Sequence, residues 1–284
     1  MKLSLRKRAQ VVKADDDDAA RWQPPADIAI TDPHCHLTNL SAFDYQTNAT
    51  LYKNHSWTLP LYRLASQGSA LPTARILFLA TSRCAPEQML GYTEWAQTVA
   101  AEAAAAGAGR RGDPGIGGII SVAPIETGAK VASHLDALEA HVPLWKGIRQ
   151  PLSADNPDGP VSENFIEGLK LLHAKGKTFD IQLKSGQLMD AVDMVSRAPK
   201  TMRFALNHLG APDVKNASAF DAWAHDLAQL ALFPNAFLKV NAAQLFFHPS
   251  SSVHSLTDTP GGVVALLLRR RLEPQGKLLG RSLG

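Results

Sequence analysis

Short apolar runs alternate with longer helical patterns along most of this 284-residue chain. Parallel strands that are covered on both faces are apolar throughout, so such runs indicate buried strands. Alternation of strands with helical segments predicts βα units. Seven strands are expected, at residues 28–30, 75–80, 119–123, 145–149, 179–183, 204–208 and 237–241. The pattern therefore predicts an α/β fold.

Five helical patterns fill the gaps between these runs. They lie at residues 86–106, 131–140, 162–176, 187–197 and 220–232. The glycine fingerprint of a dinucleotide-binding βαβ unit is absent from the sequence, which disfavours an open doubly wound sheet. Repeated βα units in a chain of this length predict a (β/α)8 TIM-barrel-like fold. No eighth strand is recognisable, so we expect an incomplete barrel with about seven strands.

The ends of the chain differ from its middle. Residues 1–26 carry blocks of charge, which are typical of a disordered, solvated tail. Residues 27–247 hold the expected barrel. Residues 248–284 mix Leu, Arg and Gly without a strand period and form a divergent C-terminal segment. We hypothesise that this chain is a truncated or divergent form of a longer barrel protein.

Charge and cysteine content limit the class of partner. The net charge is +3, and much of the excess lies in the first thirteen residues and in 269–271. A nucleic-acid-binding protein would show a basic face within its folded body, so no nucleic-acid partner is expected. No apolar run reaches the roughly 20 residues that span a bilayer, so no membrane partner is expected. Two distant cysteines favour a reducing, cytoplasmic location, with organelle targeting by the N-terminal tail as an alternative.

The strongest candidate site follows the first run, in the segment Asp32-Pro33-His34-Cys35-His36. Residues two apart on a strand point to the same face, so His34 and His36 should project together. The carboxyl ends of barrel strands are where active sites lie. Two imidazoles there could bind a divalent metal or donate to a substrate oxygen. The alternative is a pair of histidines in ordinary hydrogen bonds.

Two further candidates end other strands. His208 ends the sixth run and Arg149 ends the fourth, so both belong on the same rim of the barrel as the histidine pair. An arginine there could hold a carboxylate or a lactone oxygen through two parallel hydrogen bonds. The alternatives are a capping histidine before a Gly-Pro turn and an arginine in a salt bridge along the rim.

Three motifs occur in this order: Asp-Pro-His-x-His-Leu, Lys-Gly-Ile-Arg and Leu-Asn-His-Leu-Gly-x-Pro. Together they resemble the amidohydrolase-2 family of TIM-barrel metal-dependent hydrolases. Within that family the resemblance is greatest to the lactonases, which include fuconolactonase, rhamnonolactonase and pyrone-dicarboxylate lactonase. It extends over residues 27 to 245, which is most of the chain.

The resemblance implies roles for five residues. His34, His36 and His208 match histidines that bind one divalent metal (Zn or Mn) or polarise the substrate carbonyl. Arg149 matches an arginine that orients the substrate. Gln182 stands where many metal-loaded relatives carry a further histidine, and an amide is a poor zinc ligand beside imidazole. Gln182 is therefore expected to bind substrate, and operation without metal is the alternative to a bound divalent ion.

The resemblance also implies a general base, an aspartate on the eighth strand. Asp258 is the one Asp-x-Pro candidate after residue 241, and it has no apolar strand before it. Loss of a general base costs roughly a hundred- to ten-thousand-fold in rate. The expected function is a hydrolase that opens the lactone (carboxylic ester) ring of a sugar-derived or aromatic-derived acid. The alternatives are a metal-dependent decarboxylase and a non-catalytic degenerate barrel. A small lactone or carboxylate is the expected partner, and the sequence does not indicate an oligomeric state.

Overall fold

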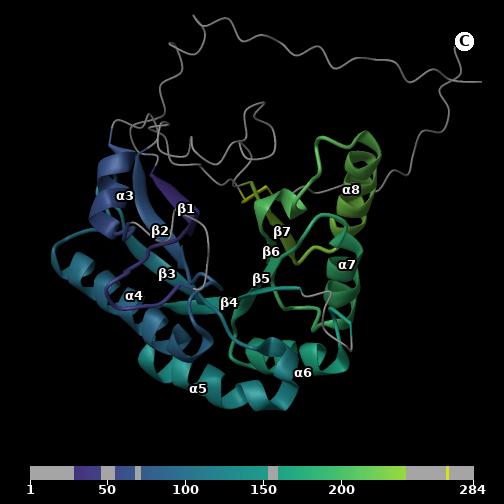
Figure 1. Cartoon of the computed structure of the whole chain (residues 1–284), viewed down its shortest axis with the longest axis horizontal. Helices are drawn as coiled ribbons and strands as arrows, with labels where there is room; N and C mark the ends of the chain where they lie inside the picture. The colour runs from purple at the N-terminus through teal and green to yellow at the C-terminus, as the bar shows by residue number, and fades with distance from the viewer. Residues whose placement is uncertain (1–28, 46–54, 68–71, 153–158, 241–266, 269–284) are drawn as a thin grey trace, which may run out of the picture.

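The computed structural model describes residues 29–45, 55–67, 72–152, 159–240 and 267–268. Its strands form one sheet in the order β1-β2-β3-β4-β5-β6-β7-β8, and β1 to β7 are parallel. These seven strands curl into a half-barrel (Figure 1), which confirms the expected incomplete TIM-barrel-like fold. They are β1 (Ile30–Cys35), β2 (Thr73–Leu79), β3 (Gly115–Ser121), β4 (Trp145–Pro151), β5 (Thr178–Gln182), β6 (Phe204–Leu206) and β7 (Ala236–Lys239).

Helices follow the strands, and α4 to α8 lie along the outside of the curled sheet (Figure 1). The α-helices are α3 (Leu59–Ser66), α4 (Met89–Ala105), α5 (Ala132–His141), α6 (Glu163–Ala174), α7 (Leu188–Arg197) and α8 (Ala217–Leu230). Three short 3-10 turns are η1 (Pro86–Gln88), η2 (Ile125–Val131) and η3 (His208–Gly210). All five helical patterns in the sequence correspond to a helix here. None of the described helices is long and apolar enough to cross a bilayer.

The eighth strand differs from that of a closed barrel. β8 (Leu267–Leu268) has two residues and pairs antiparallel with Leu238 and Lys239 of β7. A (β/α)8 barrel closes with a parallel eighth strand, so this pairing does not complete one. The predicted tail at 1–26, Asp258 and most of the divergent segment at 248–284 lie outside the described residues.

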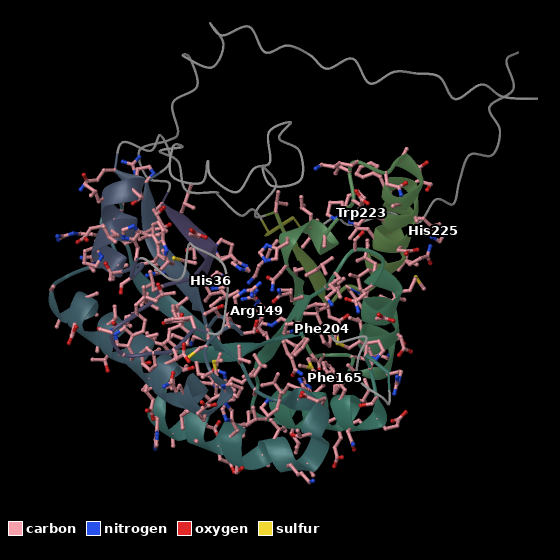
Figure 2. All side chains as sticks on the ribbon, in the orientation of Figure 1. His36, Arg149, Phe165, Phe204, Trp223 and His225 are labelled. Atoms are coloured by element: carbon pink, nitrogen blue, oxygen red, sulfur yellow. The ribbon has the colours of Figure 1, made fainter. Side chains whose placement is uncertain are left out.

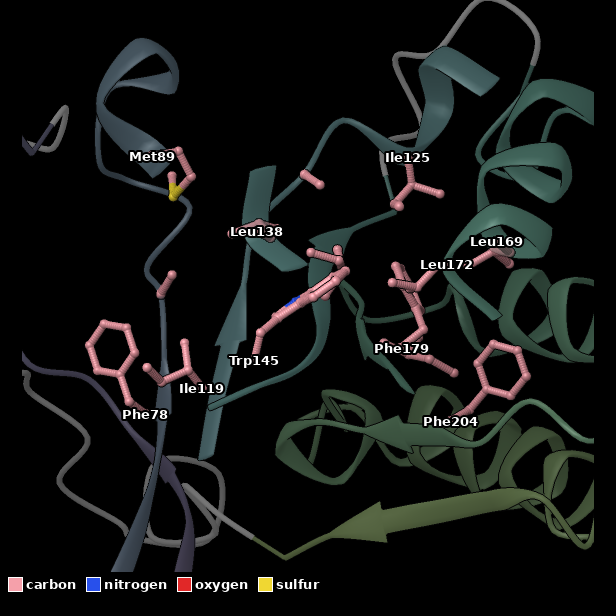
Figure 3. Close-up of a cluster of buried hydrophobic side chains, with 14 of the residues drawn as sticks. Phe78, Met89, Ile119, Ile125, Leu138, Trp145, Leu169, Leu172, Phe179 and Phe204 are labelled. Atoms are coloured by element: carbon pink, nitrogen blue, oxygen red, sulfur yellow. The ribbon is translucent and has the colours of Figure 1, made fainter. Parts of the chain in front are cut away.

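The core lies between the sheet and the helices behind its middle strands (Figure 3). Phe78, Trp145 and Phe179 of β2, β4 and β5 are at most 1% exposed. Leu138 of α5 and Leu172 of α6 are completely buried in the same cluster. Full burial of such side chains stabilises a fold by about 1.5–3 kcal/mol each. The middle of the half-barrel is thus a rigid base for the residues at its rim.

β1 carries the histidine motif further into the sheet than the sequence predicts. The predicted strand ends at residue 30, whereas β1 runs through Pro33 to Cys35. A proline lacks the N–H that a ladder needs, and its usual place is an edge strand. The register of β1 against β2 shifts between Asp32 and Cys35, around this proline. Such an irregularity re-aims the side chains beside it, which here are those of His34 and His36.

β4 and β5 approach closely below the rim. A Cβ atom at Gly147 would collide with the backbone of Thr178, so glycine is required at this contact. The two strands then pair without a shift, and Arg149 lies opposite Asp180. The Gly-Ile-Arg motif therefore places its arginine at a fixed height in the half-barrel.

Candidate active site

The two motif histidines meet at the end of β1. Their Nε2 atoms are 3.2 Å apart, and their ring planes are almost perpendicular, at 86°. His36 Nδ1 lies 2.7 Å from the carbonyl oxygen of Leu79 on β2. A carbonyl oxygen only accepts, so this contact assigns the proton of His36 to Nδ1 and leaves a lone pair on Nε2. His34 Nε2 can donate to that lone pair.

His208 joins the pair from the other side of the half-barrel. Its ring centroid lies 4.6 Å from that of His34, with the planes tilted by 50°. The structure therefore brings together all three histidines that the sequence singles out, from β1 and from the turn after β6. Their roles in binding or catalysis stay predictions.

His208 stands in an unusual turn. Four consecutive residues have positive φ: His208 (54°), Leu209 (56°), Gly210 (75°) and Ala211 (54°). A left-handed conformation costs roughly 1–2 kcal/mol for each residue other than glycine. The Trp223 indole of α8 donates to the Leu209 carbonyl at 2.8 Å and holds the turn. Strain of this kind clusters at functional sites, and here it fixes the histidine that reaches His34.

Arg149 lies beside the histidines and is 5% exposed. Its Nη1 atom is 3.4 Å from His36 Nε2 and 3.5 Å from the carbonyl oxygen of Ala80. Figure 2 shows Arg149 and His36 next to each other in the hollow of the sheet. The guanidinium therefore faces the lone pair of His36. The sequence predicts that these two residues lie on the same rim of the barrel, and here they are neighbours.

All three imidazoles are neutral at pH 7. Burial lowers the pKa of His36 to about 3 and that of His208 to about 4, and it holds the pKa of His34 well below its usual value. The positive charge of Arg149 lowers each pKa further. The cluster is a group of neutral rings next to a cation, and it favours negative charge in its neighbourhood.

Two buried carboxylates support the cluster, and sequence reasoning did not single them out. Asp32 accepts from the backbone N–H of His34 at 3.0 Å and from the Tyr62 hydroxyl at 2.9 Å. Asp180 accepts from Lys239, and both side chains are at most 3% exposed. Burial raises the pKa of Asp32. Lys239 lies within the apolar seventh run of the sequence, and a lysine is almost never fully buried unless it is paired. That position could have indicated a buried carboxylate partner, which is Asp180.

A divalent metal fits this set of residues poorly. The described residues contain no group of three or more His, Cys, Asp or Glu side chains arranged to hold a metal ion. The lone pair of His36 that a metal would use already faces the Arg149 cation at 3.4 Å. The buried Lys239 ammonium adds a second positive charge that acts on all three histidines. We therefore derive no chemical step through a metal.

A pocket of about 390 Å³ opens beside His36 and Arg149. Thr81, Ser82 and Arg83 line it after β2, and Gln182, Leu183 and Lys184 line it at the end of β5. Pro151 and Leu152 complete the lining. The Gln182 Oε1 atom is buried and has no hydrogen-bond partner among the described residues. Gln182 thus lines a pocket, and its role in binding a substrate stays a prediction.

Comparison with known proteins identifies relatives over most of the chain. Residues 31–267 match a family model described as Amidohydrolase (Amidohydro_2). Among curated proteins, the chain is similar to an uncharacterized protein, y4mH, of Sinorhizobium fredii. The two are 24% identical over 236 residues, which span 76% of this chain and 73% of that protein.

Solved structures with the same fold are also amidohydrolases. One from Burkholderia multivorans, with bound Zn, has a TM-score of 0.58 at 17% identity over 75% of this chain and 69% of that chain. Amidohydrolase 2 from Bifidobacterium longum subsp. infantis has a TM-score of 0.55 at 20% identity, over 75% and 73% of the two chains. A probable 2-pyrone-4,6-dicarboxylic acid hydrolase from Acinetobacter baumannii, with citric acid bound, has a TM-score of 0.54 at 14% identity, over 79% and 74%.

Proposed function

This chain belongs to the amidohydrolase family, and we propose that it opens the lactone ring of a sugar-derived or aromatic-derived acid by attack of water. The observation that carries the proposal is the cluster of neutral His34, His36 and His208 beside the buried Arg149 cation. A structural relative is named as a probable pyrone-dicarboxylic acid hydrolase, an enzyme for one such lactone.

Arg149 supplies the electrostatic part of the proposed reaction. Water attack on a lactone carbonyl places negative charge on the carbonyl oxygen. A buried guanidinium stabilises that charge more strongly than an exposed one, since little water surrounds it. The positive pocket favours the transition state over the neutral ester, which is the requirement for catalysis.

The histidines position the reacting groups. A base with a pKa near 3 takes a proton from water poorly at neutral pH, so His36 acts as a hydrogen-bond acceptor in this proposal. The nearby carboxylates Asp32 and Asp180 already bind Tyr62 and Lys239. The general base is therefore not assigned among the described residues. Asp258, the sequence candidate, lies outside them.

We propose operation without metal, because the His36 lone pair that a metal would need faces the Arg149 cation at 3.4 Å. The alternative from the resemblance is one Zn or Mn ion held by His34, His36 and His208. Such an ion would act as a Lewis acid on the carbonyl. Chelation separates the two: metal-free activity survives treatment with EDTA, and metal-dependent activity is lost and returns with added Zn²⁺ or Mn²⁺.

The main test is acid release from a panel of sugar lactones and 2-pyrone-4,6-dicarboxylate in a pH-stat. We expect release by the purified chain and a loss of about 10²–10³-fold in kcat with R149M, because one stabilising donor to the oxyanion is removed. The exposed Arg203 provides a matched control, and R203M should hydrolyse at the unchanged rate. Equal rates for R149M and the unchanged chain would contradict the proposal, as would the absence of any release.

A non-catalytic barrel is the second candidate. The engagement of both carboxylates near the histidines favours it. It predicts that the pocket binds small acids while no lactone is opened. The decarboxylase alternative predicts release of CO2 from an aromatic acid, which the same purified chain can be assayed for directly.

A further inference from the structure

We propose that Trp223 of α8 (Figure 2) is a positioning residue for the candidate active site. Its indole N–H donates to the Leu209 carbonyl at 2.8 Å and so holds the left-handed turn that presents His208 to His34. Trp223 acts through this turn and does not touch the reacting atoms. The inference rests on the proposed lactone-opening function, and it gives the last of the described helices a part in that function.

The backbone of the turn after β6 is unfavourable for the residues that form it. His208, Leu209 and Ala211 have φ of 54°, 56° and 54°, and none of them is a glycine. In this left-handed region the Cβ atom of an L-residue lies too close to the following carbonyl oxygen, and residues other than glycine adopt it singly. Three such residues in one turn need contacts with the rest of the fold to stay in this conformation.

The hydrogen bonds within the turn do not use the Leu209 carbonyl. The N–H of Gly210 donates to the Asn207 carbonyl at 3.0 Å. The N–H of Ala211 donates to the His208 carbonyl at 2.9 Å. The Leu209 carbonyl accepts instead from an indole that lies 14 residues further along the chain. This bond therefore ties the turn to a separate element, helix α8.

Packing around Gly210 fixes the same arrangement. A Cβ atom at Gly210 would lie 3.0 Å from a methyl group of Leu188 on α7 and 3.5 Å from the Trp223 Nε1 atom. The turn is thus enclosed between α7 and α8. The Trp223 ring stacks on that of Phe220, with centroids 4.9 Å apart and planes inclined by 29°. This stack orients the indole N–H toward the turn.

The turn sets the direction of the His208 side chain, because His208 is its first left-handed residue. The His208 ring centroid lies 4.6 Å from that of His34. Catalytic groups work only when they are held within about 0.5 Å of the productive geometry, and a displacement of about 1 Å can cost about a hundredfold in rate. Loss of the indole donor lets the turn adopt other conformations, in which His208 no longer faces His34.

The first test needs no substrate. It is the nuclear Overhauser effect between the ring protons of His34 and His208 in the full chain labelled at histidine. We expect a cross-peak in the unchanged chain that weakens about twofold or more in W223F, because one net hydrogen bond shifts a two-state population by about two- to tenfold. A cross-peak of unchanged strength in W223F would overturn the proposal.

The matched control is W95F, the same substitution at a half-buried tryptophan of α4 whose ring stacks on Tyr92. It should leave the cross-peak between the two histidines unchanged. An equal weakening in W95F and W223F would mean that any loss of an indole disturbs the site, which would also overturn the proposal. Circular dichroism of both variants checks that the fold is kept.

Lactone hydrolysis is the second readout. W223F should lower kcat by about two- to tenfold with little change in KM, because Trp223 holds a reacting group and is not among the residues that line the pocket. A purely structural role would lower the fraction of folded chain and leave kcat per folded molecule unchanged. Unchanged kcat per folded molecule in W223F would therefore overturn the role in catalysis.

A third variant separates the hydrogen bond from the ring. Replacement of Trp223 by benzothienylalanine keeps two fused rings and the stack on Phe220, and it exchanges the N–H for sulfur. We expect it to reproduce the effects of W223F on the cross-peak and on kcat. A benzothienylalanine variant that behaves like the unchanged chain would show that packing alone holds the turn, and would overturn the assignment to the indole N–H.

The two readouts distinguish failure of this inference from failure of the proposed function. A weakened cross-peak in W223F, in a chain that opens no lactone, would reject the lactonase and retain the control of His208 by Trp223. Lactone hydrolysis at the same kcat by W223F and the unchanged chain would retain the lactonase and reject Trp223 as a positioning residue.

Discussion

The N-terminal half of the sheet and its C-terminal edge are built differently. Ile76, Phe78 and Leu79 of β2 are completely buried, whereas Ala236, Phe237 and Leu238 of β7 are half-buried. Helix α4 buries six side chains, while α8 buries Leu230 alone. The first region is held by apolar packing on both sides of the strands. The second has much less buried apolar surface to hold it among the described residues.

The candidate site spans both regions. His36 and Arg149 rest on β1, β2 and β4, through contacts with Leu79 and Ala80. His208 and Lys239 belong to the C-terminal edge, where specific polar contacts replace packing. The ion pair between Lys239 and Asp180 and the hydrogen bond from Trp223 hold that edge. One half of the site is therefore fixed by the core and the other half by a few individual bonds.

The largest expected effect tests the packing difference directly. W145A should lower the free energy of unfolding by about 3–5 kcal/mol, because a fully buried indole leaves a cavity. F237A, the matched aromatic-to-alanine change on the half-buried β7, should cost about 1–2 kcal/mol, in line with its smaller burial. Urea denaturation followed by circular dichroism measures both. Equal losses would show that the two regions are packed equally well.

The buried ion pair should be almost as costly to break. K239M leaves the Asp180 carboxylate buried without a cation, and we expect a loss of about 3–5 kcal/mol. The double variant K239M/D180L removes both charges and should recover most of that loss. Urea titration of the two single variants and the double variant measures the coupling. A K239M chain as stable as the unchanged protein would mean that the pair does not hold the edge.

The hydrogen bond to the strained turn should contribute less. W223F keeps an aromatic ring beside Phe220 and removes the indole donor to the Leu209 carbonyl. The expected loss is about 1 kcal/mol of stability. Amide hydrogen exchange should quicken at Gly210 and Ala211 while β2 stays protected. Uniform exchange across the molecule would contradict a local role for Trp223.

The smallest effect concerns pH in the well-packed region. Burial lowers the pKa of His134, whose Nε2 donates to the Val122 carbonyl at 3.1 Å. The folded state therefore prefers the neutral ring of His134. The stability that this preference contributes is fully present above the unfolded pKa of about 6.5 and is lost as pH falls through the folded pKa. H134Q keeps a donor without a titrating group. Between pH 7 and pH 5, the H134Q variant should lose slightly less stability than the unchanged chain. Urea titration at both pH values measures the two losses, and equal losses would contradict the prediction.

The sequence predicts α4 to α8 well, misses α3 and places the first strand less well. Helical bounds such as 187–197 agree with α7 within one residue, because a strong apolar periodicity and a clear C-terminal stop mark it. The first strand was placed too early, since Pro33 and the charged Asp32 interrupt the apolar run that signals a strand. Its continuation depends on pairing with β2, which the local sequence does not encode.

The sequence by itself determined the order of the strands and the rim on which four candidate residues lie, which are His34, His36, Arg149 and His208. Parallel strands bring their carboxyl ends to one rim of a sheet, and a two-residue repeat points side chains to the same face. Only the tertiary structure decided how they meet. The Leu79 carbonyl sets the proton of His36, the left-handed turn aims His208, and Lys239 pairs with Asp180 across β6. These contacts join residues that are distant in sequence, and their geometry depends on strand register and packing, which local periodicity does not specify.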